Sequence, residues 1–131
     1  MRECPYCRKM RTGEGVVAEN ELAVALWDQY PLNPGHTLIV PRRHEGDYFK
    51  LTAQEQTAIV DLMQRVKTTL DVEFAPAAYN VGLNSGPAAG QTIPHTHVHL
   101  IPRYLGDVPD PRGGVRWIIP ERAPYWQDGQ S

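Results

Sequence analysis

Residues 90–103 read Gly-Gln-Thr-Ile-Pro-His-Thr-His-Val-His-Leu-Ile-Pro-Arg and hold three of the five histidines in the chain. These three occupy every second position: His95, His97 and His99. Alternation with a period of two is typical of a half-buried β-strand, because successive side chains leave a strand on opposite faces. We therefore predict a strand that presents three imidazoles in one row, about 6.6 Å apart. Its pairing is expected to stop at Pro102, since proline has no N–H to donate.

A row of histidines points to chemistry rather than to packing. Neutral imidazole can attack phosphorus, accept a proton or bind zinc near pH 7, because its ordinary pKa is about 6.5. The alternative is a polar outer face that happens to be rich in histidine, but such a face rarely gathers three. We interpret the row as part of a functional site. Adjacent rings in one row need ligands from other strands before they can share a metal ion.

Length and composition limit the classes of function. The chain has 131 residues, is 41% hydrophobic and carries a net charge of −2, which indicates one domain with one main core. This balance favours neither a nucleic-acid groove nor an acidic membrane surface as a partner. No apolar run approaches the roughly 20 residues that span a bilayer, and the first residues do not resemble a signal peptide. We expect a cytoplasmic protein.

The other elements are read from hydrophobic periodicity and turn residues. Residues 1–15 are expected to form an irregular lead. Thr52 and Glu55 have the spacing of a capping box, and an apolar stripe follows at helical spacing, so a helix is predicted from Thr52 to about Leu70 or Val72. Strands are predicted at residues 16–19, 22–27, 36–40 and 77–84, before the histidine strand.

This order of elements predicts an α+β domain. Short connections favour antiparallel pairing, so we expect a five-stranded antiparallel sheet with one main helix on one face, plus short helical and loop segments. Residues 1–103 are predicted to form the single domain. Residues 104–131 are rich in proline and glycine and are predicted to be a C-terminal extension that packs on the domain or on a dimer partner.

Two cysteines near the start suggest a metal site. Cys4 and Cys7 are separated by two residues, a spacing that favours metal binding or redox chemistry over a structural disulfide in a reducing compartment. Adding His44 and His95 gives a two-Cys, two-His set of the kind that holds structural zinc. The long separation between the pairs departs from a zinc finger. A thioredoxin-like redox pair and two idle thiols are the alternatives.

Two motifs together resemble the histidine-triad (HIT) family of nucleotide hydrolases and transferases. One is Gly90-Gln91-Thr92 followed by the His-x-His-x-His run, and the other is Pro-Gly-His-Thr-Leu-Ile-Val-Pro at residues 34–41. The resemblance also covers the order of elements from about residue 4 to residue 103. It implies that His97 is the nucleophile that attacks the α-phosphorus of a nucleotide and forms a covalent nucleotidyl-histidine.

The resemblance implies the remaining roles residue by residue. Gln91 and Thr92 match the residues that contact the phosphate and leaving group, and His99 and His36 match histidines of the catalytic hydrogen-bond network. Asp28 matches the residue that binds the ribose hydroxyls, and Asn84 a polar residue at the phosphate end. The purine slot is matched by Pro5, Tyr6, Leu26 and Leu38, although plain core packing is nearly as good a reading for the two leucines. Members with an N-terminal Cys-x-x-Cys hold zinc through residues that match Cys4, Cys7, His44 and His95.

The implied function is cleavage of dinucleoside polyphosphates such as diadenosine tetraphosphate, by a homodimer. Gln91-Thr92 and Pro102-Arg103 favour this branch, and Arg103, Arg112 and Arg116 are candidates to receive additional phosphates. Pro94 and Thr96 depart from the commonest residues at their positions. Cleavage of the P–N bond of purine nucleoside phosphoramidates is the nearest alternative. Alternatives of another class are an open-site zinc enzyme and a non-catalytic nucleotide-binding adaptor.

Overall fold

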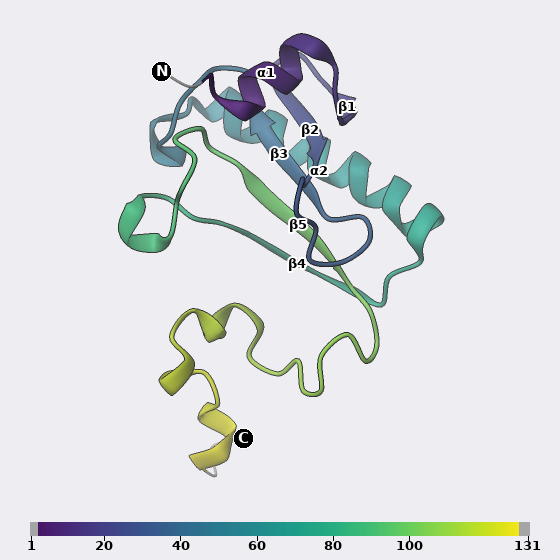
Figure 1. The fold of residues 1–131 in the computed structure, drawn as a ribbon, viewed down its shortest axis with the longest axis vertical. Coiled ribbons are helices and arrows are strands. Elements are labelled where there is room, and N and C mark those ends of the chain that lie inside the picture. The colour runs from purple at the N-terminus through teal and green to yellow at the C-terminus, as the bar shows by residue number, and fades with distance from the viewer. Residues whose placement is uncertain (1–2, 129–131) are drawn as a thin grey trace.

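Five antiparallel strands form one sheet in the order β1-β2-β3-β5-β4 in the computed structural model, which describes residues 3–128 (Figure 1). The strands are β1 (Val16–Glu19), β2 (Ala23–Trp27), β3 (Thr37–Pro41), β4 (Ala78–Leu83) and β5 (Val98–Arg103). All four strand pairs are antiparallel. The predicted α+β class, the five-stranded sheet and the single main helix are therefore confirmed.

The main helix, α2 (Ala53–Phe74), begins at the predicted capping box. The Glu55 N–H donates to Thr52 Oγ1 at 3.0 Å, and the Thr52 N–H donates to Glu55 Oε1 at 2.9 Å. The helix ends at Phe74, two residues beyond Val72 and four beyond Leu70, and Phe74 makes a tertiary contact there, an edge-to-face packing against Trp27 with ring centroids 6.3 Å apart. Its C-cap is Ala75, which has a φ of 46° and precedes Pro76.

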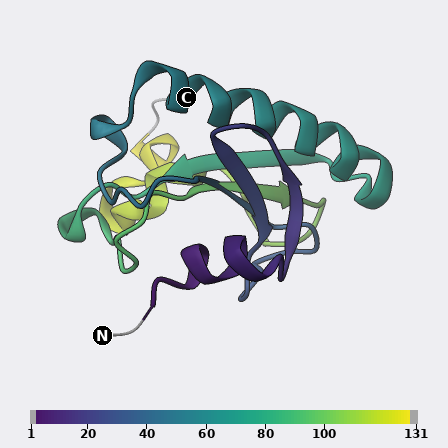
Figure 2. The ribbon, with the colours of Figure 1, turned by 90° about the horizontal axis from the view of Figure 1, so that it is seen from above.

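The sheet is covered on both faces. Figure 2 shows α2 along one face and the N-terminal helix α1 (Pro5–Thr12) on the other. The core under α2 joins Ile59, Leu62, Val66 and Leu70 of the helix to inward-facing residues of β2, β3 and β5. A smaller core under α1 contains Tyr6, Val24, Leu26, Leu38 and Val40. Period-two alternation in β2 and β3 supplies both cores, because neighbouring residues face opposite sides.

Helix α1 replaces the irregular lead that we expected for residues 1–15. Pro5 occupies its first turn, where a missing N–H costs nothing, and Gly13 ends it with a φ of 82°. A helix of eight residues is marginal by itself in water, so its stability depends on packing. Tyr6 supplies that packing by being buried against the sheet. Two turns of sequence carry little periodicity, which explains why the helix was missed.

The histidine strand starts later than predicted, at Val98 rather than at His95. Pairing with β3 runs from Thr37 opposite Leu100 to Ile39 opposite Val98. Before Val98 the chain leaves the sheet, because both the backbone N–H and the hydroxyl of Thr96 donate to the Glu45 carbonyl, at 2.7 and 2.8 Å. Of the three histidines, only His99 therefore lies within β5, and His95 and His97 come from the segment before it, although the ring centroids of His97 and His99 still lie 5.4 Å apart.

Pro102 does not stop the pairing, contrary to our expectation. It lies within β5 opposite Tyr79 of β4. Its carbonyl accepts a hydrogen bond from Asn33 Nδ2 at 3.0 Å, on the side of β5 that faces away from β4. Because the N and O of one residue point to the same side of an antiparallel strand, the missing N–H also faces away from β4. Pairing with β4 therefore loses no hydrogen bond.

Residues 104–128 continue beyond β5 as turns and short 3₁₀ helices, drawn in yellow-green and yellow in Figure 1. The 3₁₀ helices are η1 (Tyr48–Lys50) and η2 (Pro87–Ala89) in the domain, and η3 (Gly114–Ile118), η4 (Pro120–Arg122) and η5 (Tyr125–Asp128) in this extension. Val115 and Trp117 line a cavity together with Asn80 of β4 and Ile101 of β5. The division at residues 103 and 104 stays a prediction, and residues 1–2 and 129–131 of the two predicted ranges lie outside the described residues.

Between residues 3 and 128, no helix combines the length and the apolar character needed to cross a membrane.

Replacing Thr52 by Ala removes the side-chain acceptor of the capping box. We expect the free energy of unfolding to fall by about 1 kcal/mol, because one N–H in the first turn of α2 loses its partner. Chemical denaturation followed by circular dichroism measures the change. The matched control is Thr57→Ala, which deletes the same atoms from an exposed position inside α2. Equal destabilisation by both variants would contradict the capping role.

Candidate functional site

Two cysteines and two histidines converge beside the N-terminus of α1. Cys4 precedes α1 and Cys7 lies in its first turn, while His44 and His95 come from the segments that follow β3 and precede β5. Their Sγ and Nδ1 atoms all lie within 4.8 Å of one another. Both thiols are free. The structure therefore brings together all four residues that were predicted to bind a metal ion.

The spacing of these atoms fits a four-coordinate ion. His44 Nδ1 lies 3.1 Å from His95 Nδ1, and the Cys4 and Cys7 sulfurs lie 3.5 and 3.6 Å from His95 Nδ1. A tetrahedral ion with nitrogen and sulfur ligands at about 2.0–2.3 Å separates its ligand atoms by about 3.3–3.8 Å. The cluster can thus hold a metal ion with little rearrangement.

His95 is prepared for this task by its other ring nitrogen. Its Nε2 donates to the Pro41 carbonyl at 2.8 Å, which leaves the lone pair on Nδ1 facing the cysteines and His44. Burial lowers the pKa of His95, and the neighbouring rings of His44 and His97 act in the same direction. The neutral imidazole, which is the form that binds metals, is therefore favoured at neutral pH.

His97 is buried, and its tautomer is set by the backbone. Its Nδ1 lies 2.8 Å from the carbonyl oxygen of His95, which can only accept, so Nδ1 carries the proton. The lone pair is then on Nε2. The Tyr6 ring packs on the imidazole with centroids 5.1 Å apart. His97 thus has one nitrogen occupied by the protein and one with a lone pair available for chemistry.

A second cluster joins His36, His99 and Asp28. His36 Nδ1 accepts the Leu32 N–H at 3.1 Å, so its proton resides on Nε2. That nitrogen lies 2.9 Å from His99 Nδ1 and 3.3 Å from Asp28 Oδ2. His99 consequently accepts on Nδ1 and carries its own proton on Nε2. The resulting chain of donors runs from a backbone amide through two imidazoles.

Burial keeps both of these histidines neutral. Burial, together with the neighbouring rings of His97 and His36, lowers the pKa of His99 to about 4, although the Asp28 carboxylate acts in the opposite direction. Burial also lowers the pKa of His36, although Asp28 opposes the shift. At pH 7 the two imidazoles are therefore neutral and act as hydrogen-bond donors and acceptors.

The same cluster has the composition of a two-His, one-carboxylate metal site, but its tautomers disfavour one. The Leu32 amide occupies the lone pair of His36 Nδ1, so His36 Nε2 is protonated and cannot ligate unless the ring becomes an imidazolate. In the Cys4 cluster, by contrast, the inward-facing nitrogen of His95 is the unprotonated one. We therefore treat the Asp28 cluster as a hydrogen-bond relay.

Gln91 ties two loops together. Its Nε2 donates to the carbonyls of Gly46 and Ile93 at 2.8 and 3.1 Å, and its Oε1 accepts the Gly86 N–H at 2.8 Å. These bonds give Gln91 a definite place in the loop before the triad. Thr92 beside it is exposed. Their expected contacts with phosphate stay predictions.

Three of the four residues expected in the purine slot share one cluster, the small core under α1. Leu26 and Leu38 are 0% and 4% exposed, which agrees with packing beneath Tyr6. Tyr6 is 6% exposed, and its ring contacts His95 as well as His97. Pro5 is half-buried at the start of α1. The purine slot stays a prediction, and Tyr6 is the member of it that contacts the His97 ring.

A cavity of about 320 Å³ lies against His99. Asn84, expected at the phosphate end, lines it, and so do Val115 and Ile118 from the C-terminal extension. Sequence reasoning assigned no role to Val115, and Ile118 was only part of an apolar piece, residues 117–119, that could cover a sheet edge, reach a second subunit or flank the site. Isolated apolar residues in an irregular segment give no signal of where that segment packs, so only the structure could place them.

The three arginines considered for extra phosphates already have partners within the chain. Arg103 binds both oxygens of Asp107 and also Asn80 Oδ1. Arg112 binds Asp110 through two nitrogens and lies over the Trp126 ring. Arg116 donates to the carbonyls of Arg122 and Ala123 and lies over the Tyr125 ring. The structure therefore favours a structural role for all three.

Comparison with known proteins gives consistent results. The HIT domain profile matches residues 11–106. The chain is 35% identical over 102 residues to the bis(5'-nucleosyl)-tetraphosphatase (asymmetrical) of Schizosaccharomyces pombe, an alignment that covers 78% of this chain and 56% of that protein. The chain thus spans little more than half of this relative's length.

Solved structures show the same fold. A HIT family protein from Bacillus anthracis superposes with a TM-score of 0.74 at 34% identity, covering 80% of this chain and 76% of that one. A histidine triad family protein from Mycobacterium smegmatis, described as zinc-bound, superposes with a TM-score of 0.72 at 26% identity, covering 88% and 90%. The HIT domain match at residues 11–106 includes all five histidines and Asp28, and it begins after Cys4 and Cys7.

The neutral His99 makes stability depend on pH. As the pH falls from about 6.5 towards 4, His99 becomes protonated in the unfolded chain but stays neutral in the native protein. The free energy of unfolding therefore falls over this range. Between about pH 7.5 and pH 4.5 we expect wild type to lose about 2 kcal/mol more than His99→Asn, which has no group to titrate there. Urea unfolding at both pH values measures this. Parallel losses in the two proteins would contradict the assignment.

Proposed function

Because the chain belongs to the HIT domain family, we propose that it is a nucleotide hydrolase or nucleotidyl transferase that cleaves dinucleoside polyphosphates at an α-phosphorus. The name of the S. pombe relative supports this substrate class. The single observation that carries the proposal is the tautomer of His97. Its Nδ1–H is held by the His95 carbonyl, and its Nε2 lone pair is available as a nucleophile.

The reaction proceeds in two displacements. The Nε2 lone pair of His97 forms a bond to the α-phosphorus, while the bond from that phosphorus to the bridging oxygen breaks and the nucleoside polyphosphate leaves with the electron pair. The His99 Nε2–H donates a hydrogen bond to the leaving oxygen, and the nucleoside polyphosphate departs as the anion. Water then attacks phosphorus and releases its proton to solvent, while the P–N bond breaks, its electron pair returns to His97 Nε2 and the nucleoside monophosphate leaves. Each barrier is lower than that of a single direct displacement.

The surrounding residues take the roles expected from the sequence. The cavity beside His99 receives the phosphates, with Asn84 at its edge. Gln91 and Thr92 orient the phosphate and leaving group, and Asp28 binds the ribose hydroxyls. Asp28 Oδ1 accepts the Tyr30 N–H at 2.7 Å, so this loop conformation aims Oδ2 at the histidines. The purine rests near Tyr6 and Pro5, with Leu26 and Leu38 beneath.

Zinc is the metal that suits the four-ligand cluster. Two thiolates and two imidazoles are the donor set of closed structural zinc sites, and the zinc-bound M. smegmatis relative supports the assignment. When bound, zinc cross-links α1 to the segments around His44 and His95. The protein is proposed to work as a homodimer in the cytoplasm. The outer edge of β4 and the apolar extension beside it support the dimer.

The alternatives differ in their use of the same site. Cleavage of phosphoramidates needs the same His97 chemistry with a nitrogen leaving group. An open-site zinc enzyme is disfavoured, because the Nδ1 lone pair of His95 faces Cys4, Cys7 and His44 in a four-ligand set. His99 accepts from His36 on Nδ1 and carries its proton on Nε2, so it offers no lone pair to a metal ion. An adaptor would bind nucleotides without turnover. Comparing diadenosine tetraphosphate with adenosine phosphoramidate, in water and in added phosphate, separates the enzymatic alternatives.

Replacing His97 by Ala should abolish turnover of diadenosine tetraphosphate, by about a thousandfold or more, because no nucleophile remains. In wild type, rapid quenching should trap an adenylyl group on His97, located by mass spectrometry. The control is zinc content and folding of the variant, which should equal wild type. An adenylyl group found on another residue, or turnover that persists in His97→Ala, would contradict the covalent mechanism.

Replacing Cys7 by Ser should remove zinc. Wild type should hold about one zinc per chain, and the variant should hold much less and melt at a lower temperature, since bound metal stabilises the native state. Metal analysis and thermal unfolding measure both effects. The control is His36→Asn, which alters the relay but should keep its zinc. Loss of metal in the control as well would indicate that the ion binds in the cluster of Asp28, His36 and His99, and it would contradict the proposed site.

A further inference from the structure

His44 is the least supported member of the metal cluster. It is exposed and lies in the irregular segment between β3 and α2, whereas His95 is fully buried and the cysteines lie at the start of a helix. Backbone ordering costs about 1–2 kcal/mol per residue. A ligand on such a segment binds tightly only if something other than the metal holds the segment in place.

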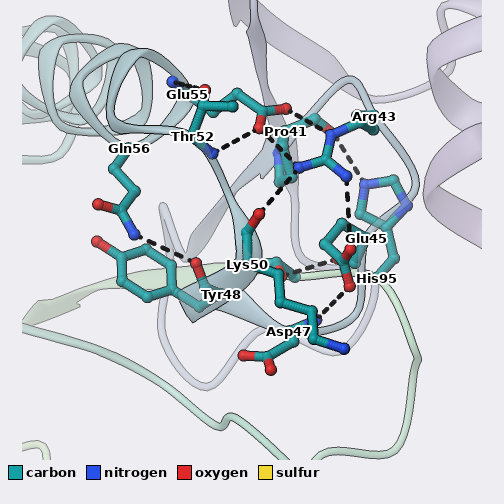
Figure 3. Close-up of polar contacts among 11 residues, drawn as sticks. Pro41, Arg43, Glu45, Asp47, Tyr48, Lys50, Thr52, Glu55, Gln56 and His95 are labelled. Atoms are coloured by element: carbon teal, nitrogen blue, oxygen red, sulfur yellow. Dashed lines mark hydrogen bonds and ion pairs between the residues drawn. The ribbon is translucent and has the colours of Figure 1, made fainter.

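Arg43, the residue before His44, is anchored to the N-terminus of α2. Its Nη2 and Nε donate to the two carboxylate oxygens of Glu55 at 2.8 and 3.1 Å, and Nη2 also donates to the Lys50 carbonyl at 3.2 Å. Figure 3 shows this guanidinium between Glu55, Lys50 and Glu45. The Glu55 side chain is only 7% exposed and the Arg43 side chain 48%, so the carboxylate half of this two-point contact is shielded from water while the guanidinium is partly solvated.

Glu45, the residue after His44, is anchored to the other side of the site. Its carbonyl accepts both hydrogen bonds of Thr96, the neighbour of His95. Its carboxylate lies 3.4 Å from Arg43 Nη1 and accepts the Asp47 N–H at 3.0 Å. His44 is therefore held from both sides, by α2 through Arg43 and by the triad segment through Glu45.

We propose that the Arg43–Glu55 pair positions His44 for zinc and thereby couples metal binding to the capping box of α2. This inference rests on the proposed zinc site. Glu55 serves two partners at once, because its Oε1 also accepts the Thr52 N–H that begins the helix. Without the guanidinium, the segment that carries His44 is no longer held to α2. Part of the free energy of zinc binding is then spent on ordering that segment, so the affinity for zinc falls. Outer partners of metal ligands typically change affinity by ten- to a hundredfold.

The coupling must be reciprocal, because it is a free-energy difference between linked equilibria. If Arg43 strengthens zinc binding by a given factor, zinc must strengthen the contribution of Arg43 to folding by the same factor. A residue that only stabilises the fold would destabilise the apo and zinc-bound proteins equally and leave zinc affinity of the folded protein unchanged. This distinction makes the proposal testable without any assay of activity.

The test compares Arg43→Met with Arg42→Met. Arg42 is the neighbouring arginine, with a side chain 40% exposed against 48% for Arg43, and it binds Glu19 and the carbonyls of Asn20 and Glu21 instead. Zinc affinity is measured by competition with a chromophoric chelator on protein shown to be folded by circular dichroism. We expect affinity to fall ten- to a hundredfold in Arg43→Met and less than twofold in Arg42→Met.

Two milder variants keep the test decisive if Arg43→Met folds poorly. Arg43→Lys keeps the charge but loses the fork, and Glu55→Gln keeps the shape but loses the carboxylate. Both should weaken zinc binding, and both should be destabilised more in the zinc-bound than in the apo form. Unchanged affinity in all three, or equal destabilisation of both forms, would overturn the proposal. Wild type that binds no zinc would instead refute the zinc site, and this inference with it.

Discussion

The hydrogen bond from His95 Nε2 to the Pro41 carbonyl is the contact on which both the cysteine cluster and the orientation of His97 depend. It fixes the fully buried His95 ring so that Nδ1 faces Cys4, Cys7 and His44. The backbone carbonyl of this same residue then holds the Nδ1–H of His97. The metal ligand and the orientation of the reactive ring thus share one anchor, and displacing that anchor would disturb both.

The sheet supplies the rest of the site through its register. Leu38 of β3 lies opposite His99 of β5, so His36, two residues before Leu38 on the same face, reaches His99 diagonally. A shift of one residue would send His99 to the core under α2 and destroy the network. The alternation of buried and half-buried residues from Val98 to Arg103 specifies this register, because Val98 and Leu100 must face the helix.

Patterns that repeat along the chain were readable from sequence, and contacts across the chain were not. The capping box of α2 and strands β1 to β4 depend on sequence neighbours, and they appear where predicted to within one residue. Helix α1 was missed because its stability comes from Tyr6 packing on a distant strand pair. The late start of β5 was missed because Thr96 prefers the Glu45 carbonyl to the sheet. Both site clusters were anticipated by residue type, whereas the tautomers required the structure.

Those tautomers explain how chemically identical side chains divide the work. A ring that donates to a carbonyl, as His95 and His97 do, keeps a lone pair on its other nitrogen for a metal ion or for phosphorus. A ring that accepts from an amide, as His36 does, must donate through its other nitrogen and is a poor ligand. The partner of the outer nitrogen therefore decides the function of the inner one. This rule favours the cysteine cluster over the Asp28 cluster as a metal site and leaves the Nε2 lone pair of His97 available, although His95 and His97 are only two residues apart in sequence.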